Sequence, residues 1–485
     1  MSVLKGATAT IFGRAINTIV SFIGMAILGR ILFPEDFGLF AIVLAIQAII
    51  FPFIDCGLLF SYIKRDSVDI EVSNSFYTIN MITSSLSVIF MIAISYVVAA
   101  FYDEPILQWL LIYIAPALLI MGLAMQPGAL LTKEKKFVQL ALIGSGAVIS
   151  GIIVSVFCAW LGWGVWSLVV KVYVEVIVTY MLTMFFSKNN CKIVKIKILK
   201  KYTRDLKFGL SNAWSRVIGS SIISSDKLIL GIFFSTANLG GYSRSQQLAQ
   251  MPNGMILSPL TSNILMYLHD IKEQKVNKLM SIIISIVALM AIPIVLIVTS
   301  GDVFLPLVLG EKWVEFGYLL QLLGVYGVAR VFENICYIYG INEKKIRRHI
   351  YAVYGGIITI VIIPLMVLLV DNNLAVYTAV LSIGNALYWG FVLYYCLVSD
   401  YKDDKKQIRN GLLKVVFILL APTALFFYFK QYLDPPPNIL NIEYVLTILL
   451  IITVLVSTTI GVVAKNEIIQ IYKKIKTYKN KRKLA

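Results

Sequence analysis

The sequence predicts an all-α polytopic membrane protein with about fourteen transmembrane helices in two related bundles. Three observations lead to this prediction. The composition is too apolar for a soluble protein, the basic residues collect in alternate loops, and one stretch of the first half returns in the second half. Of the 485 residues, 59% are hydrophobic and 14% are charged, and the mean hydropathy is +0.83. A water-soluble chain could not bury that much apolar surface.

Apolar runs of about 20 residues, the length that crosses a bilayer as a helix, recur along the whole chain. Short charged or turn-forming segments separate them. The fourteen predicted spans are 8–31, 37–61, 73–101, 105–131, 137–160, 163–187, 208–234, 238–265, 279–299, 314–340, 349–370, 373–398, 409–429 and 441–464.

The basic residues distinguish the two sides of the membrane. Turns that follow odd-numbered spans are nearly free of lysine and arginine, as at Pro34-Glu35-Asp36, whereas the opposite loops carry clusters such as the segment 188–207. Cytoplasmic loops are enriched in these residues, so we expect both termini in the cytoplasm. This placement accounts for the net charge of +17 without nucleic acid as a partner. The first span is longer than the apolar region of a signal peptide, so we expect an uncleaved anchor.

An internal repeat relates the two halves of the chain. The stretch 14–40 returns as 216–242, which is 202 residues later. The most informative matching pairs are Arg14 and Arg216, Gly29 and Gly231, and Gly38 and Gly240. Apolar residues match easily by chance, so the arginine and the two glycines carry the comparison. We expect two homologous bundles, each opened by a helix with an arginine inside it.

The repeat also predicts the domain organisation. The linker and the tail both mix basic with aliphatic residues, which suits segments that lie on anionic lipid headgroups. Anchoring of the topology alone is the other interpretation of these segments. The predicted parts are an N-terminal lobe with spans one to six (1–187), a basic cytoplasmic linker (188–207), a C-terminal lobe with spans seven to twelve (208–398), two further spans (399–464) and a basic cytoplasmic tail (465–485).

Ionisable residues inside the spans are the main indication of function, because each costs roughly 2.5–3.5 kcal/mol at a helix centre. They should therefore face one another or a water-filled cavity. Lys171 and Glu175 are four residues apart, and Arg330 and Glu333 are three apart, so each pair can neutralise itself. Lys414 is near enough to a helix end for its ammonium group to reach the interface.

Other ionisable residues have no such obvious partner. Asp226 and Lys227 are adjacent and point about 100° apart on a helix, so they do not simply pair with each other. Asp55 is expected to cap its helix or to pair with Arg14 or Lys64. The residues to which we assign a cavity-lining or gating role are Asp55, Lys171, Glu175, Asp226, Lys227, Arg330 and Glu333.

Arg14 and Arg216 are related by the repeat, and neither has an acidic residue three or four positions away. We expect them to face each other between the bundles, where two guanidinium groups would form a site for an anion. Guanidinium geometry suits bidentate binding of phosphate. The other interpretation is that both side chains reach out to lipid headgroups of the inner leaflet.

Several function classes are excluded by what the sequence lacks. It has no phosphate-binding loop of the GxxxxGK[ST] type and no soluble domain that could hold a nucleotide sugar. The two histidines, His269 and His349, fall in predicted basic loops, and the five cysteines are scattered, so we expect no metal site, no cofactor and no disulfide framework. These features indicate a carrier rather than an enzyme.

Three motifs occur in a fixed order along the chain. Gly-Arg, an acidic proline turn and Phe-Gly lie within Gly29–Gly38, Asp-x-Gly-Leu lies at Asp55–Leu58, and Leu-Gly-x-Tyr-Ser lies at Leu239–Ser243. With these motifs and the halfway repeat, the whole chain resembles the polysaccharide-transporter (oligosaccharide flippase, Wzx-like) family of the multidrug/oligosaccharidyl-lipid/polysaccharide (MOP) exporter superfamily.

This resemblance implies two pseudo-symmetric six-helix lobes around a central cavity, followed by two C-terminal helices. The implied function is alternating-access transport of O-antigen, capsule or exopolysaccharide repeat units on undecaprenyl diphosphate across the bacterial cytoplasmic membrane. Related flippases use cavity arginines on spans one and eight, for which Arg14 and Arg244 are the candidates here. The expected pyrophosphate site is therefore Arg14, Arg216 and Arg244. The expected partners are the lipid-linked oligosaccharide, membrane lipids, and polysaccharide polymerase and assembly proteins.

Two other functions stay open at this point. A cation-coupled drug or metabolite antiporter of the same superfamily would need a cluster of buried carboxylates, and the first six spans offer only Asp55 and Glu175. A membrane scaffold for an assembly complex would give no reason for arginines inside the spans of both repeats.

Overall fold

The computed structural model describes residues 2–55, 62, 70–188, 191–195, 198, 200–257, 264, 275–343, 345–431 and 442–464. Some predictions concern residues outside these ranges, namely the basic loop at Lys64, His269, the tail 465–485 and parts of the linker. Arg14 lies in a described helix, but its side chain is outside the description. Within the described ranges the chain is helical throughout, apart from short turns and the extended segment 191–195.

The chain groups into two compact units, Met1–Ser243 and Arg244–Ala485. The boundary falls inside helix α10 (Thr236–Pro252), so the predicted seventh span belongs by its packing to the first unit. The functional division into lobes 1–187 and 208–398 stays a prediction.

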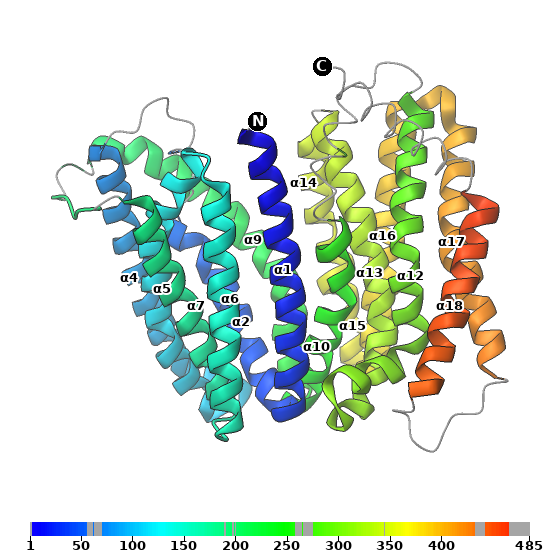
Figure 1. Cartoon of the computed structure of the whole chain (residues 1–485), viewed down its shortest axis with the longest axis horizontal. Helices are drawn as coiled ribbons and strands as arrows, with labels where there is room; N and C mark the ends of the chain where they lie inside the picture. Colours follow the sequence, from blue (N-terminus) through cyan, green and yellow to red (C-terminus); the bar gives the residue numbers. More distant parts are fainter. Residues whose placement is uncertain are drawn as a thin grey trace. The chain divides into compact units, whose positions relative to one another are not determined.

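Helices of the first unit pack side by side in an order that differs from their order in the chain (Figure 1). Helix α4 packs against α5, α5 against α7, α7 against α6, and α6 against α1, while α2 packs against α9. The helices of this unit are α1 (Ser2–Ile31), α2 (Pro34–Asp55), α4 (Ile70–Tyr102), α5 (Pro105–Lys133), α6 (Phe137–Trp160), α7 (Trp166–Ser187) and α9 (Thr203–Phe233), with the first part of α10 and the short 3-10 turn η1 (Lys200–Tyr202).

The second unit is built around α12, which packs against α13, α17 and α18. Its core is aliphatic and includes Val287, Met290 and Ile294 of α12, together with Leu393 and Val415 from neighbouring helices. Its elements after α10 and the π-helical turn η2 (Asn253–Leu257) are α12 (Lys275–Leu309), η3 (Glu311–Phe316), α13 (Gly317–Asn342), α14 (Ile346–Gly355), η4 (Ile358–Ile362), α15 (Ile363–Val370), α16 (Leu374–Asp400), η5 (Lys402–Asp404), α17 (Lys405–Lys430) and α18 (Ile442–Val463).

The polytopic membrane fold is confirmed, because eleven described helices are long and apolar enough to cross a membrane. Among the described residues, three predicted spans do not meet this criterion, and they are the three that carry the proposed binding arginines. In α1 only Ile16–Ile31 counts as an apolar helix, and α10 has 17 residues before its π-helical turn. Helix α9 has 31 residues, but Arg216, Asp226 and Lys227 make it too polar. A helix that lines protein or water rather than lipid does not need to be apolar.

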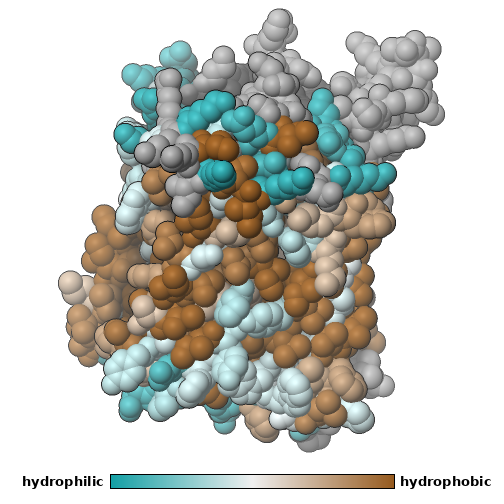
Figure 2. All heavy atoms as spheres, turned by 90° about the vertical axis from the view of Figure 1, so that its left-hand side faces the viewer, coloured by the Kyte–Doolittle hydropathy of each residue, from teal (hydrophilic) through white to brown (hydrophobic). Residues whose placement is uncertain are grey.

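A side view of the protein shows where lipid would contact it (Figure 2). Apolar side chains cover the middle of this face, and hydrophilic side chains collect along its upper edge. Helix α4 contributes several exposed apolar residues to the surface of the first unit, among them Leu86, Ile89, Phe90 and Val97. Their exposure would be unfavourable in water, and it is the expected arrangement in a bilayer.

The described part of the linker is attached to α4 through its backbone. The N–H of Lys192 donates to Asn74 Oδ1 at 2.9 Å, and the N–H of Val194 donates to Thr78 Oγ1 at 3.0 Å. Asn74 and Thr78 are both buried. These bonds satisfy backbone donors of an extended segment that has no other secondary structure. The predicted contact of the linker with anionic lipid stays a prediction.

Helices α2 and α10 approach each other through two glycines that correspond in the internal repeat. A Cβ atom placed on Gly38 would lie 1.8 Å from the carbonyl oxygen of Thr236, and one placed on Gly240 would lie 1.9 Å from the carbonyl oxygen of Pro34. Pro34 and Thr236 are themselves 202 residues apart, so each segment makes the same contact with the other. Such reciprocal contacts are what a local two-fold relation produces, and they support the repeat.

We predict that Gly38→Ala and Gly240→Ala each destabilise the protein by about 1–3 kcal/mol, because the new methyl group has to displace backbone. Gly219→Ala in α9 is the matched control, since a Cβ atom there meets nothing within 4 Å. Alanine is the better helix former, so the control should be neutral or slightly stabilising. Thermal unfolding in detergent measures the difference. Equal melting temperatures for all three variants would contradict this helix crossing.

Candidate functional site

Arg216 lies in α9 and forms an ion pair with Asp55 of α2. Its Nη2 is 2.9 Å from Asp55 Oδ2 and also donates to the carbonyl oxygen of Pro52 at 3.3 Å. The side chain of Asp55 is only 7% exposed, whereas that of Arg216 is 36% exposed. A buried carboxylate without a partner would be strongly destabilising, so Arg216 makes the burial of Asp55 possible. This contact differs from the expected pairing of Asp55 with Arg14 or Lys64.

The ion pair leaves part of the guanidinium group available. A guanidinium carries five N–H donors, and the bonds of Arg216 to Asp55 and Pro52 use the same nitrogen, Nη2. Within the described part of the chain, Arg216 Nε is buried and has no hydrogen-bond partner. A second anion that reaches the exposed part of this side chain would provide partners for the remaining donors.

Hydroxyl groups follow Arg216 along α9. The helix carries Ser220, Ser221, Ser224 and Ser225 in the three turns after Arg216. Ser224 is buried and the other three are partly buried. Ser225 donates to the carbonyl oxygen of Ile222 at 2.7 Å. A predicted membrane span with this many hydroxyls suits contact with polar cargo or water better than contact with lipid.

Asp226 is buried near the other end of α9. Its Oδ2 accepts a hydrogen bond of 2.9 Å from the hydroxyl of Tyr242, and its Oδ1 accepts one of 2.7 Å from the backbone N–H of Lys227. Tyr242 belongs to the Leu239–Ser243 motif and is itself fully buried. The motif therefore contributes Gly240 to the helix crossing and Tyr242 to the carboxylate of α9. The side chain of Lys227 is partly buried.

The two predicted neutral pairs are present. Lys171 Nζ lies 3.1 Å from Glu175 Oε1 in α7, and Arg330 of α13 donates a short hydrogen bond to Glu333. Glu175 lies directly over Gly151 of α6, where a Cβ atom would be 2.5 Å from Glu175 Cγ. These pairs are internally compensated, which favours a structural role for them. Their assigned role in gating is untested.

The three arginines of the expected pyrophosphate site are not brought together by the described residues. The side chain of Arg14 is outside the description, Arg216 belongs to the first unit, and Arg244 belongs to the second unit, where it is partly buried in α10. The expectation that Arg14 and Arg216 face each other is untested. In the described ranges, no group of three His, Cys, Asp or Glu side chains is placed to hold a metal ion.

Two features of the structure were not found from the sequence. The ion pair between Asp55 and Arg216 joins residues far apart in the chain, and no local spacing could indicate it. His349 was expected in a basic loop but lies in α14, with its ring centroid 5.4 Å from that of Tyr337 and 5.7 Å from that of Trp389. The helix begins at Ile346, directly after the lysines of the loop, so the histidine already packs on its inner side.

Comparison with known families gives one match that covers most of the chain. Residues 27–317 match the family of polysaccharide biosynthesis proteins. This segment contains all three sequence motifs and two of the three arginines of the expected pyrophosphate site, Arg216 and Arg244.

Curated relatives from several bacteria are similar to the chain. The lipopolysaccharide biosynthesis protein WzxC of Escherichia coli is 26% identical over 344 residues, which is 68% of this chain and 68% of the relative. The teichuronic acid biosynthesis protein TuaB of Bacillus subtilis is 22% identical over 348 residues, covering 68% and 69% of the two chains. The succinoglycan biosynthesis transport protein ExoT of Rhizobium meliloti is 20% identical over 345 residues, covering 67% of each.

Solved structures show the same fold. The lipid II flippase MurJ in an inward closed conformation matches with a TM-score of 0.71 and 14% identity, covering 96% of this chain and 100% of that one. An inward-facing multidrug resistance transporter of the MOP superfamily matches with a TM-score of 0.53 and 14% identity, covering 81% and 95%. Since the family match spans more than half of the chain, the protein belongs to the polysaccharide biosynthesis protein family, a polysaccharide-transporter family of the MOP exporter superfamily.

Proposed function

We propose that the protein is a flippase that moves oligosaccharide repeat units linked to undecaprenyl diphosphate across the bacterial cytoplasmic membrane. Its termini lie in the cytoplasm, and it works by alternating access. The names of its relatives support the polysaccharide part of this proposal, since they refer to lipopolysaccharide, teichuronic acid and succinoglycan biosynthesis. The glycan of this particular chain would then be an O-antigen, capsule or exopolysaccharide unit, which a polymerase extends after transport.

The observation that carries the proposal is the position of Arg216. It lies inside a predicted span, it is anchored by Asp55 through one nitrogen, and its side chain remains 36% exposed. A diphosphate moved through a bilayer requires cationic groups that accompany it, because an isolated anion is costly in hydrocarbon. Arginine is suited to this role because its planar donors match phosphate oxygens in pairs.

The contacts of α9 suggest how one cargo molecule would be held. The pyrophosphate would bind Arg216 in competition with Asp55, which holds the guanidinium group when no cargo is bound. Arg14 and Arg244 would complete the site as the transporter closes around it. The hydroxyls of Ser220, Ser221, Ser224 and Ser225 would lie along the path of the sugars, whose own hydroxyls exchange hydrogen bonds with them and with water.

The ion pairs of the first unit do not favour the antiporter. Exchange of cations requires carboxylates that bind a cation in one state and release it in another. Asp55 and Glu175 are both in contact with basic side chains of the protein itself, Arg216 and Lys171. The scaffold alternative is also less well supported, because it gives no use for the open donors of Arg216.

Loss of the arginines should leave the lipid-linked unit on the inner leaflet. In cells that lack this protein, we expect undecaprenyl-diphosphate oligosaccharide to accumulate on the cytoplasmic side, and wild type to relieve the accumulation. The double variant Arg14→Ala/Arg216→Ala should fail to do so at equal expression, and Arg216→Lys should relieve it only in part because it keeps the charge without the paired donors. Access of a glycosidase or a chemical reagent to the glycan from either side measures the distribution. Normal export without the protein would overturn the flippase function, whereas normal export by the double variant would overturn only the site.

Asp55 should limit how tightly Arg216 holds its cargo. The variant Asp55→Asn keeps a hydrogen-bond acceptor but removes the competing charge, so we expect diphosphate lipid to bind about three- to tenfold more tightly. Transport should become slower, because release becomes harder. Glu175→Gln removes the other carboxylate paired in this unit and is the matched control, with no expected change in affinity. Unchanged or weaker binding by Asp55→Asn would contradict direct competition at Arg216.

A further inference from the structure

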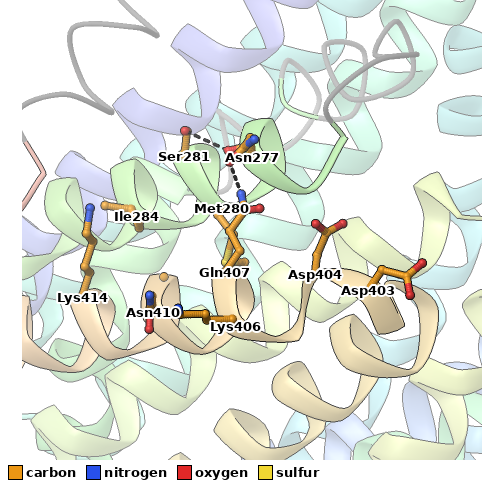
Figure 3. A pocket seen from close by; sticks show the side chains of 11 residues that line it. Asn277, Met280, Ser281, Ile284, Asp403, Asp404, Lys406, Gln407, Asn410 and Lys414 are labelled. Carbon is orange, nitrogen blue, oxygen red and sulfur yellow. Dashed lines mark hydrogen bonds between the residues drawn. The ribbon is translucent and has the colours of Figure 1, made fainter.

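A polar groove lies between α12 and α17 in the second unit, at the end of these helices where lysines are frequent (Figure 3). Its volume is about 440 Å³. Met280, Ile284 and Gly411 form its apolar part, and all three are buried. The floor is tight, since a Cβ atom on Gly411 would lie 2.6 Å from the sulfur of Met280. The two helices therefore meet closely below a groove that stays open above them.

Charged groups of both signs line this groove in a definite order. Asp403 and Asp404 of η5 lie at one end, and Lys414 of α17 lies at the other (Figure 3). Asp404 and Lys414 are ten residues apart, which corresponds to about 15 Å along a helix. Lys406 and Asn410 lie between them on the same helix. The groove thus runs from acidic at the helix start to basic at a position inside the membrane span.

Amide groups fix the wall that faces α17. Gln407 of α17 donates a hydrogen bond to the side-chain oxygen of Asn277 of α12, and Ser281 donates to the backbone carbonyl of Asn277 at 2.9 Å. The bond from Gln407 ties the two helices together beside the groove, whereas the bond from Ser281 stays within α12. The amide of Asn410 lies exposed in the groove.

We infer that this groove binds the headgroup of a phospholipid that carries a primary ammonium group, of the phosphatidylethanolamine class. The ammonium would be held by Asp403 and Asp404, and the phosphate by Lys406, Asn410 and Lys414. This order matches the direction of a lipid in a bilayer, where the ammonium lies outermost, the phosphate below it, and the acyl chains toward the membrane centre. The acyl chains would then lie along the apolar surface of α17, where Leu413, Val416, Phe417 and Leu420 are exposed.

The charge pattern selects this class over other membrane lipids. A phosphatidylglycerol headgroup has no cation for the two carboxylates, and a phosphatidylcholine headgroup has a quaternary ammonium without N–H donors. Free phosphate would bring an anion next to Asp403 and Asp404 without compensation. The lipid-linked oligosaccharide carries a diphosphate and no ammonium, so this lipid would be distinct from the cargo.

A lipid at this position would stabilise the packing of the C-terminal helices. Lys414 was interpreted from the sequence as a residue that reaches out to the interface, but its side chain lines the groove between α12 and α17. A phosphate bound to it would lie next to the Asn277–Gln407 contact that joins these two helices. The lipid would in this way cover the contact between α17 and the core helix of the second unit.

Native mass spectrometry of the whole protein, released from nanodiscs of defined composition, tests the inference. In nanodiscs with equal parts of phosphatidylethanolamine, phosphatidylcholine and phosphatidylglycerol, we expect wild type to retain one phosphatidylethanolamine in preference to the others. The variants Asp403→Asn/Asp404→Asn and Lys414→Gln should each weaken its retention about tenfold, as expected for lost charge-assisted hydrogen bonds. Lys405→Gln is the matched control, because this exposed lysine of the same helix does not line the groove.

Two results would overturn the inference. Equal retention of the three lipids would show that the carboxylates do not select an ammonium group. Retention of phosphatidylethanolamine by the Asp403→Asn/Asp404→Asn variant at the wild-type level would place the lipid elsewhere. Thermal unfolding in lipid-free detergent identifies any variant with a damaged fold. A variant that unfolds at the wild-type temperature there, but loses the stabilisation by added phosphatidylethanolamine, would support the site independently of the mass measurement.

Discussion

The position of Arg216 depends on the close contact between the backbones of α2 and α10. Gly38 and Gly240 allow the helices to cross without side chains between them, and the chain enters α10 directly from α9. Helix α9 is therefore held against α2 from this crossing onward. Helix α4 also holds α9, since the hydroxyl of Tyr102 in α4 donates a hydrogen bond of 3.0 Å to the carbonyl oxygen of Leu228 in α9. At the far end of α2, about 25 Å from Gly38 at 1.5 Å per residue, Arg216 meets Asp55.

These contacts attach α2 in different ways at its two ends, to α10 near its start and to α9 at its last residue. The glycine contact is rigid, because it joins backbone to backbone with no room for adjustment. The ion pair between Asp55 and Arg216 can be exchanged, since an anionic ligand offers the arginine the same kind of partner. The proposed transport cycle would use this combination of a fixed crossing and a contact that the cargo can replace. An unpaired charge is costly inside a membrane, so Arg216 needs an anionic partner when no cargo is bound, and Asp55 is that partner.

Much of the fold could be predicted from the sequence, because hydropathy and loop charge act locally. The neutral pairs of Lys171 with Glu175 and of Arg330 with Glu333 follow from helical spacing alone. The repeat indicated that Gly38 and Gly240 correspond, but not that they touch, since contact depends on the crossing of distant helices. The same limit applies to Asp55, whose partner comes from another part of the chain. Lys414 could not be placed either, because its neighbours in the groove come from η5 and α12.

The affinities of the protein for two related lipids test whether Arg216 binds the diphosphate. Undecaprenyl diphosphate and undecaprenyl monophosphate differ only in the second phosphate, so their affinities for the purified protein isolate its contribution. We predict that wild type binds the diphosphate more tightly and that Arg216→Gln loses this preference. No preference in wild type, or a preference that persists in Arg216→Gln, would contradict binding of the diphosphate by Arg216.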